Sequence, residues 1–176
     1  MTQPKKQPSY SDRFTADFLR GFVKTNKPVS ALVIAHDGGP AEFLHECGIP
    51  SVTVYPISAH AEGSGRKVEL ICFDSKGLAA TFNERKIPPD GIDLIFIETD
   101  ARLYPECFEL TEKHLKRKGY FLFTFVLAAA PGADAAAGNT AILPEIEPFV
   151  RNLHHDRRYE AKMLNLGGGL LLARKK

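Results

Sequence analysis

The chain has 176 residues, 44% of them hydrophobic and 25% charged, with a formal net charge of +2. This length suits one folded domain, which we expect at 13–176 after a polar, disordered leader at 1–12. The nearly balanced charge argues against nucleic acid binding, and no apolar run reaches the roughly 18 residues of a membrane span. Three widely separated cysteines favour neither a disulfide framework nor a paired-cysteine metal site, so we expect a protein of the reducing cytoplasm.

The first half of the chain alternates between helical spacing and short apolar runs. The predicted elements are a helix at 13–26, a strand at 30–35, a helix that closes at Gly48, and strands at 51–55 and 67–73. The stretch 56–66 between the last two strands is too short and glycine-rich for a full crossover helix. Whether it is helical stays open.

The second half begins with the clearest strand, at 92–97. An amphipathic helix is expected after it, with basic residues from Lys113 to Lys118 in its last turns and Gly119 at its end, as the helix dipole favours. The remaining predictions are a strand at 119–127, a mobile loop at 128–139, a helix from about Ile142 to His155 interrupted by two prolines, and a hairpin at 159–176.

Strands that alternate with helices and close in one hairpin predict an α/β fold, with a mostly parallel sheet covered by helices on both faces. Ligands of such sheets bind beyond the carboxyl ends of the strands, at the switch point. Glu98 and Asp100 directly follow the strand at 92–97, so they are candidates for a ligand or metal site. The alternative is that these acids cap the following helix or face solvent.

Two sequence segments resemble a known family. The segment DLIFIETDARLYPECFELTEKHLKRKGY is similar to a strand ending in Asp-Ala-Asp-Lys, then Tyr-Pro and a helix; LNLGGGLLLARKK is similar to a closing hairpin. Both are typical of the cation-dependent O-methyltransferases, which include catechol and caffeoyl-CoA O-methyltransferases, and the chain resembles them from about Thr15 onward. The resemblance implies a Rossmann-like class I methyltransferase fold, with a seven-stranded sheet and S-adenosylmethionine over the first strands.

The family's Glu-x-Gly-x-Gly-x-Gly pattern falls on Val33, Ala35, Asp37 and Gly39, so only its last glycine is present. Such glycines let the backbone approach the ligand and take positive φ, which costs a residue with a Cβ about 1 kcal/mol or more. Asp37 also brings an anion to where the resemblance places the cofactor's carboxylate. The adjacent Gly38 could partly compensate.

Two further cofactor positions are implied by the resemblance. Tyr55 replaces an acid that binds both ribose hydroxyls, and a phenol cannot accept both bonds; Asp74 matches the acid near the adenine. S-adenosylmethionine could therefore still bind, through weakened contacts. The implied cofactor-binding residues are Ala35, Asp37, Gly38, Gly39, Tyr55 and Asp74.

The family's divalent cation is held at positions that correspond here to Glu98, Thr124 and Phe125. Phe125 offers no ligand and Thr124 only a hydroxyl, while Mg²⁺ wants near-octahedral oxygen coordination. The lysine that serves the family as general base is replaced by Ala101. We therefore expect no bound metal.

These replacements lead to two hypotheses. The first is a methyltransferase-like protein without catalysis, which acts as a binding or interaction module for a small molecule or as a homodimer. The second is an active, metal-independent methyltransferase for a small hydroxylated or amine substrate, with Glu98 or Asp100 as the base. A third, an enzyme of another class with His36 as acid or base, has no spacing that supports a particular reaction.

Overall fold

The computed structural model describes residues 13–35, 39–56, 68–70, 91–129 and 140–176. The leader at 1–12, the stretch 57–66 and most of the predicted loop at 128–139 lie outside these ranges. The main elements are α1 Arg13–Asn26, β1 Ser30–Ala35, α2 Gly39–Glu46, β2 Ser51–Pro56, β3 Val68–Leu70, β4 Ile92–Glu98, α4 Tyr104–Thr111, β5 Leu115–Thr124, β6 Leu127–Ala129, β7 Thr140–Ile142, α5 Glu147–His155, β8 Tyr159–Leu164 and β9 Leu170–Lys175, with short 3-10 turns at Ala101–Leu103 (η1) and Glu112–His114 (η2).

Seven strands form one sheet in the order β3-β2-β1-β4-β5-β9-β8. The first five are parallel, and β9 runs antiparallel to both β5 and β8. The chain order reverses at β1 and β4, where Ala35 is the register partner of Glu98. The predicted fold class, a mostly parallel sheet with an antiparallel terminal hairpin, is confirmed.

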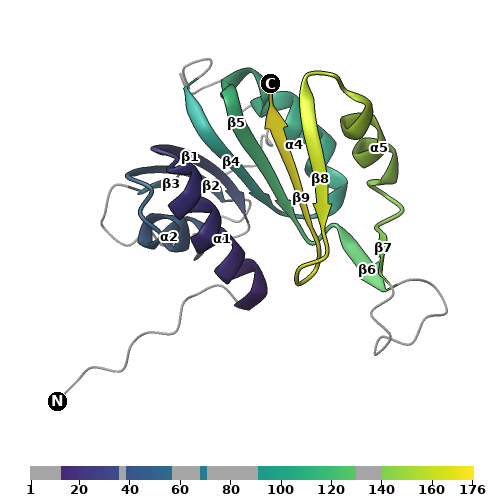
Figure 1. The fold of residues 1–176 in the computed structure, drawn as a ribbon, viewed down its shortest axis with the longest axis horizontal. Helices are drawn as coiled ribbons and strands as arrows, with labels where there is room; N and C mark the ends of the chain where they lie inside the picture. Colours follow the sequence, from purple (N-terminus) through teal and green to yellow (C-terminus); the bar gives the residue numbers. More distant parts are fainter. Residues whose placement is uncertain (1–12, 36–38, 57–67, 71–90, 130–139) are drawn as a thin grey trace.

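The helices cover both faces of the sheet, as Figure 1 shows. Alternate residues of β1 point to opposite sides because successive side chains of a strand do so. Leu32 and Ile34 join a core with α4 and α5, whereas Val33 and Ala35 join a second core with α1 and α2. β1 is therefore apolar on both faces, which explains its uninterrupted apolar run in the sequence.

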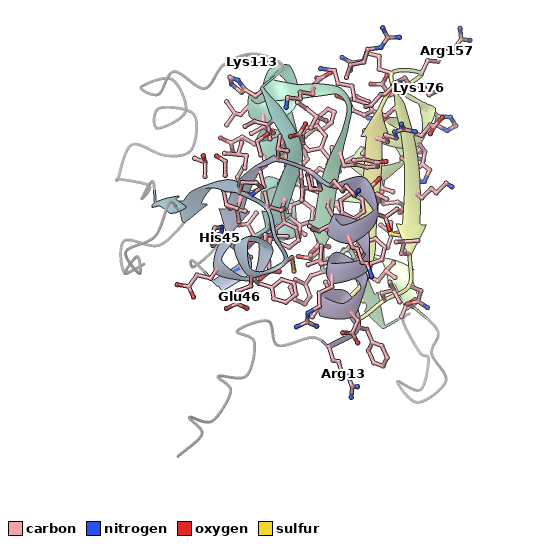
Figure 2. The ribbon with its side chains drawn as sticks, turned by 60° about the vertical axis from the view of Figure 1, so that its left-hand side comes forward. Arg13, His45, Glu46, Lys113, Arg157 and Lys176 are labelled. Carbon is pink, nitrogen blue, oxygen red and sulfur yellow. The ribbon has the colours of Figure 1, made fainter. Side chains whose placement is uncertain are left out.

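The amino ends of β1, β4 and β5 are fastened to one another by Asp93. Its carboxylate accepts hydrogen bonds from the main-chain nitrogens of Val29 and Ser30, each at 3.0 Å, and from the Ser30 hydroxyl at 2.9 Å. The Lys116 ammonium lies 2.8 Å from the other carboxylate oxygen. Figure 2 shows Lys113 and Lys176 at this edge, opposite Arg13 at the start of α1.

The helix predicted to end at Gly119 was too long. α4 ends at Thr111, η2 follows, and β5 begins at Leu115. Lys113 lies in η2, whereas Lys116 and Lys118 belong to the strand. Lys116 pairs with Asp93, and the register shifts between Ile92 and Leu94 to accommodate the extra residues. Gly119 lies within β5 and has no role as a helix cap.

Two other predicted boundaries were wrong. The helix expected from about Ile142 begins at Glu147, because Pro148 marks its first turn, where a missing amide hydrogen is tolerated, and Ile142 lies in β7. The strand expected to reach Leu127 ends at Thr124, since Phe125 takes a φ of +52°. For the strand predicted at 67–73, the structure describes only 68–70, which form β3; its predicted ends lie outside the described residues.

Candidate functional site at the carboxyl ends of β4 and β5

Glu98 is the last residue of β4 and is half-buried at the switch point of the sheet. The Thr124 hydroxyl, at the end of the neighbouring β5, donates a long hydrogen bond of 3.4 Å to the Glu98 carboxylate. Ala35 at the end of β1 completes this row, fully buried beside Glu98. The structure therefore brings Glu98 and Thr124 together, as the strand pattern predicts for the ligand crevice of a parallel sheet.

Asp100 has a different surrounding. Its Oδ1 accepts a hydrogen bond from the main-chain nitrogen of Arg102 at 3.0 Å, and thus caps η1. The Arg102 guanidinium also clamps both carboxylate oxygens. Hydrogen bonding to Asp100 raises the pKa of Arg102, so the guanidinium stays charged. These contacts are those of the capping alternative, although the strand tip still places Asp100 near Glu98.

Tyr104, at the start of α4, is fully buried beside the same edge and donates its phenolic hydrogen to the main-chain carbonyl of Thr124. Burial, followed by the nearby Glu98 carboxylate, raises the pKa of Tyr104, so the phenol stays protonated and remains a donor. Sequence reasoning did not find this residue. Its signal was the Tyr-Pro pair, in which the proline at 105 marks the first turn of a helix directly after a strand end.

Phe125 follows Thr124 with a left-handed backbone and a side chain that is 45% exposed. Its ring lies against Gly168 in the hairpin between β8 and β9. The contact is so close that a Cβ added to Gly168 would lie only 2.5 Å from the Phe125 Cδ1 atom. The phenyl group thus fills a position that the family resemblance assigns to a metal ligand.

The described donor atoms at this edge do not fit a divalent cation. Glu98 offers a carboxylate and Thr124 a hydroxyl, but Asp100 is held by Arg102 and Phe125 has no donor. Nowhere in the described ranges do three histidine, cysteine or acidic side chains gather in a way that could hold a metal. Mg²⁺ needs several oxygen ligands in near-octahedral geometry, which this set does not supply.

The residues implied as cofactor contacts are only partly described. Val33 and Ala35 are fully buried against α1 and α2, where their side chains offer no polar atom to a ligand. Gly39 is the first residue of α2, and Tyr55 pairs with Ile34 through the backbone of β2. The predicted contacts at Asp37, Gly38 and Asp74 lie outside the described residues, as does the side chain of Tyr55.

Comparison with solved structures identifies the fold as that of the methyltransferases. A protein from Staphylococcus aureus assigned as a caffeoyl-CoA O-methyltransferase is similar with a TM-score of 0.73 at 18% identity, over 95% of this chain and 85% of that one. The SAH-bound methyltransferase PaMTH1 of Podospora anserina gives 0.73 at 19%, over 96% and 80%. The O-methyltransferase of Bacillus cereus in complex with SAH gives 0.69 at 17%, over 97% and 84%.

The sequence itself shows the family. Residues 56–176 match the family model described as O-methyltransferase, so the chain belongs to the O-methyltransferase family. No curated protein matches the sequence significantly. Among the described helices, none is long and apolar enough to cross a membrane.

Proposed function

We propose that this member of the O-methyltransferase family has lost metal-dependent methyl transfer and acts as a binding module for a small molecule. One observation carries the proposal: the acid next to Glu98 is clamped by Arg102, and the residue after Thr124 is Phe125, whose side chain has no oxygen ligand and lies against the hairpin at Gly168. Among the described residues, a cation would find one carboxylate and one hydroxyl there, too few for a firm site.

Losing the cation affects the chemical step as well as affinity. A phenolic substrate with a pKa of about 10 must lose its proton before it attacks the methyl group, which costs roughly 4 kcal/mol at pH 7. Without a metal or base, that barrier corresponds to about a thousandfold in rate. Ala101, where the family resemblance implies a lysine base, cannot accept the proton.

The test is a methyl-transfer assay with S-adenosylmethionine, a catechol acceptor and Mg²⁺, combined with calorimetric titration of the cofactor. We expect turnover at background and cofactor affinity weaker than micromolar, with the protein folded. Micromolar binding of S-adenosylmethionine, as expected of a protein that retains the family's cofactor site, would rule out the strong form of the proposal. Turnover that disappears with a chelator would rule it out entirely.

A metal-independent methyltransferase is the second candidate, and the position of Glu98 favours it. This carboxylate is half-buried at the switch point, where the end of a strand can hold a base against a bound substrate. Methyl transfer would then survive a chelator and fall at least a hundredfold in Glu98→Gln. Asp100→Asn tests the other acid, and Glu106→Gln on the exposed side of α4 is the matched control.

The remaining proposals concern setting and partners. The balanced charge and the three separate cysteines support a cytoplasmic protein without nucleic acid or membrane partners. We also propose that the protein forms a homodimer, in which the module binds a second copy of the chain. Sedimentation velocity over a hundredfold range of concentration separates a monomer from a dimer.

A further inference from the structure

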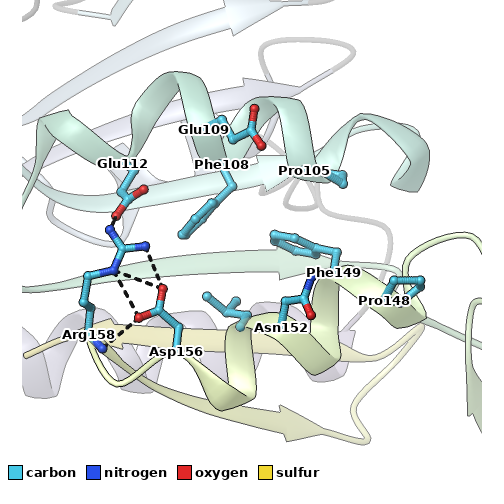
Figure 3. A pocket seen from close by; sticks show the side chains of 10 residues that line it. Pro105, Phe108, Glu109, Glu112, Pro148, Phe149, Asn152, Asp156 and Arg158 are labelled. Atoms are coloured by element: carbon cyan, nitrogen blue, oxygen red, sulfur yellow. Dashed lines mark hydrogen bonds and ion pairs between the residues drawn. The ribbon is translucent and has the colours of Figure 1, made fainter.

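A groove of about 480 Å³ lies between α4 and α5, on the outer side of the core that these helices share. Figure 3 shows its two walls, with Pro105 and Phe108 from α4 opposite Pro148, Phe149 and Asn152 from α5; Glu109 lies on the outer part of α4 and also lines the groove. No residue of the strand-end site lines it. Volumes of 300 to 1,000 Å³, with mainly apolar walls, are usual for small-molecule sites.

The bottom of the groove is aromatic and held firmly. The Phe108 and Phe149 rings meet edge to face, with centroids 5.7 Å apart. Phe108 packs on Phe121 of β5 at 4.9 Å, and Phe149 packs on Phe123 at 5.4 Å. Because the sheet supports both rings from below, they form a rigid aromatic floor against which an apolar ligand can pack.

One end of the groove is closed by an ion-pair network. The Arg158 guanidinium bonds both oxygens of Asp156, with Nη2 at 2.7 Å from Oδ2, and also bonds the Glu112 carboxylate. Arg158 therefore has its charge matched by two acids and presents no free cation to a ligand.

Two polar side chains in the walls keep unused hydrogen-bonding capacity. Glu109 is exposed on α4, Asn152 is exposed on α5, and neither side chain has a hydrogen bond or ion pair to the described part of the chain. Together with Asp156 and Glu112, Glu109 gives the lining three carboxylates against the single guanidinium of Arg158. The groove thus has an apolar floor and a net charge of two negatives, which complements a cation.

We propose that this groove binds a small aromatic amine in its protonated form. The ring of the ligand would lie against Phe149 in the groove, and its ammonium group would pair with Glu109. Aromatic faces also attract a cation electrostatically. The site lies apart from Glu98 and Thr124, so its existence does not depend on the proposed function.

Titration with 2-phenylethylamine, followed by ¹H–¹⁵N NMR of the full chain, tests the site. A ligand of this size in such a groove binds with a Kd on the order of 0.1–1 mM. We expect the amides of α4 and α5 to shift and those at the end of β4 to stay. The neutral isostere 2-phenylethanol should bind at least tenfold more weakly, and Glu109→Gln should reduce amine affinity about tenfold.

Glu106→Gln is the matched control, because this exposed acid on the same helix does not line the groove. It should leave the affinity for the amine unchanged. The proposal fails if the amine and the alcohol bind equally, if Glu109→Gln changes nothing, or if the α4 and α5 amides stay fixed up to 10 mM amine. It also fails if these amides shift on dilution alone, since the groove would then be covered by a second copy of the chain.

Discussion

Tyr104 donates its phenolic hydrogen to the main-chain carbonyl of Thr124, and this bond ties the first turn of α4 to the last residue of β5. Both residues are buried, so the bond is shielded from water. The Thr124 hydroxyl reaches the Glu98 carboxylate. The tip of β5 is thus held from the helix side while its hydroxyl reaches toward the crevice.

Tyr104→Phe removes a hydrogen-bond donor from the buried Thr124 carbonyl. Removing one partner of a buried hydrogen bond costs about 1–3 kcal/mol, so we expect the free energy of unfolding in urea to fall by that amount. Tyr120→Phe is the control, because its hydroxyl bonds the Asn26 side chain at an exposed position, and it should change stability by less than about 0.5 kcal/mol. Equal losses in the two variants would contradict a special role for the Tyr104 bond.

The sheet could be predicted because its strands are buried on both faces. Continuous apolar runs such as 30–35 and 92–97 leave few alternatives to a central strand, and the structure starts and ends them within a residue of the prediction. The start of β5 at Leu115 could not be predicted from apolar runs. Lys116 pairs with Asp93 far away in sequence, and this tertiary contact turned an apparent helix end into a strand.

The sequence predicted the location of a site residue only where that location follows from its position along a strand. Glu98 lies at the strand tip as expected. Whether Asp100 binds a ligand or caps the following turn depends on Arg102, two residues later. The sequence does not fix the direction of the Arg102 side chain. The contact from Tyr104 to Thr124 spans 20 residues and two elements, so no local pattern could reveal it.

Asp93→Asn tests the network at the amino edge of the sheet. Burial alone would raise the pKa of Asp93, but hydrogen bonds from Lys116, Ser30 and the Val29 amide hold it below the ordinary value of an aspartate. A lowered pKa means that the charged form stabilises the fold above the unfolded pKa and that this contribution declines as pH falls below about 4. We expect Asp93→Asn to lose about 2 kcal/mol at pH 7, as typical for hydrogen bonds to a charged group.

Urea unfolding of both proteins from pH 7 to pH 3 checks the sign. The difference in stability should be constant above about pH 5 and shrink toward pH 3. Asp17→Asn is the control, since that acid pairs with arginines on the exposed side of α1 and should change stability by about 0.5 kcal/mol or less. A difference that grew on acidification would contradict a lowered pKa for Asp93.

Two glycines should respond to alanine in opposite directions. A Cβ on Gly119 would lie 2.9 Å from the Lys116 carbonyl and 3.0 Å from that of Asp93, so Gly119→Ala should lose about 2 kcal/mol through backbone displacement. Gly21 is exposed within α1 with nothing within 4 Å of a Cβ, so Gly21→Ala should gain about 0.5–1 kcal/mol. Chemical unfolding measures both changes in stability. If Gly119→Ala stabilised the protein, β5 would have to pair in a different register from the one described.

Lys118→Gly should stabilise the protein although it removes a side chain. Lys118 is exposed and has a φ of +65°, a left-handed conformation that costs an L-residue about 1–2 kcal/mol. Glycine avoids this and loses about 0.5–1 kcal/mol in unfolded-chain entropy, so a net gain of about 0.5–1 kcal/mol is expected in urea unfolding. Arg117→Gly, next to it without positive φ, should lose stability. Equal losses would show that Lys118 is not left-handed in solution.

The double variant Thr124→Asp/Phe125→Asn tests why the strand ends do not suit a cation. It places a second carboxylate beside Glu98 and an amide oxygen on the next residue, the oxygen ligands that Mg²⁺ accepts. Asparagine also tolerates the φ of +52° better than phenylalanine. Without metal, the two carboxylates should repel and lower Tm. Mg²⁺ at a hundred times its Kd should then add about 2.7 kcal/mol of stability.

Thermal unfolding with and without Mg²⁺ measures this gain, and the control Thr124→Asn/Phe125→Asn supplies the amides without the new charge. We expect Mg²⁺ to raise Tm in the aspartate variant alone. A rise of the same size in the unaltered protein would mean that Glu98 and Thr124 already hold the ion with help from other groups. That result would contradict the observation on which the proposed loss of metal-dependent chemistry rests, namely that the strand ends do not suit a cation.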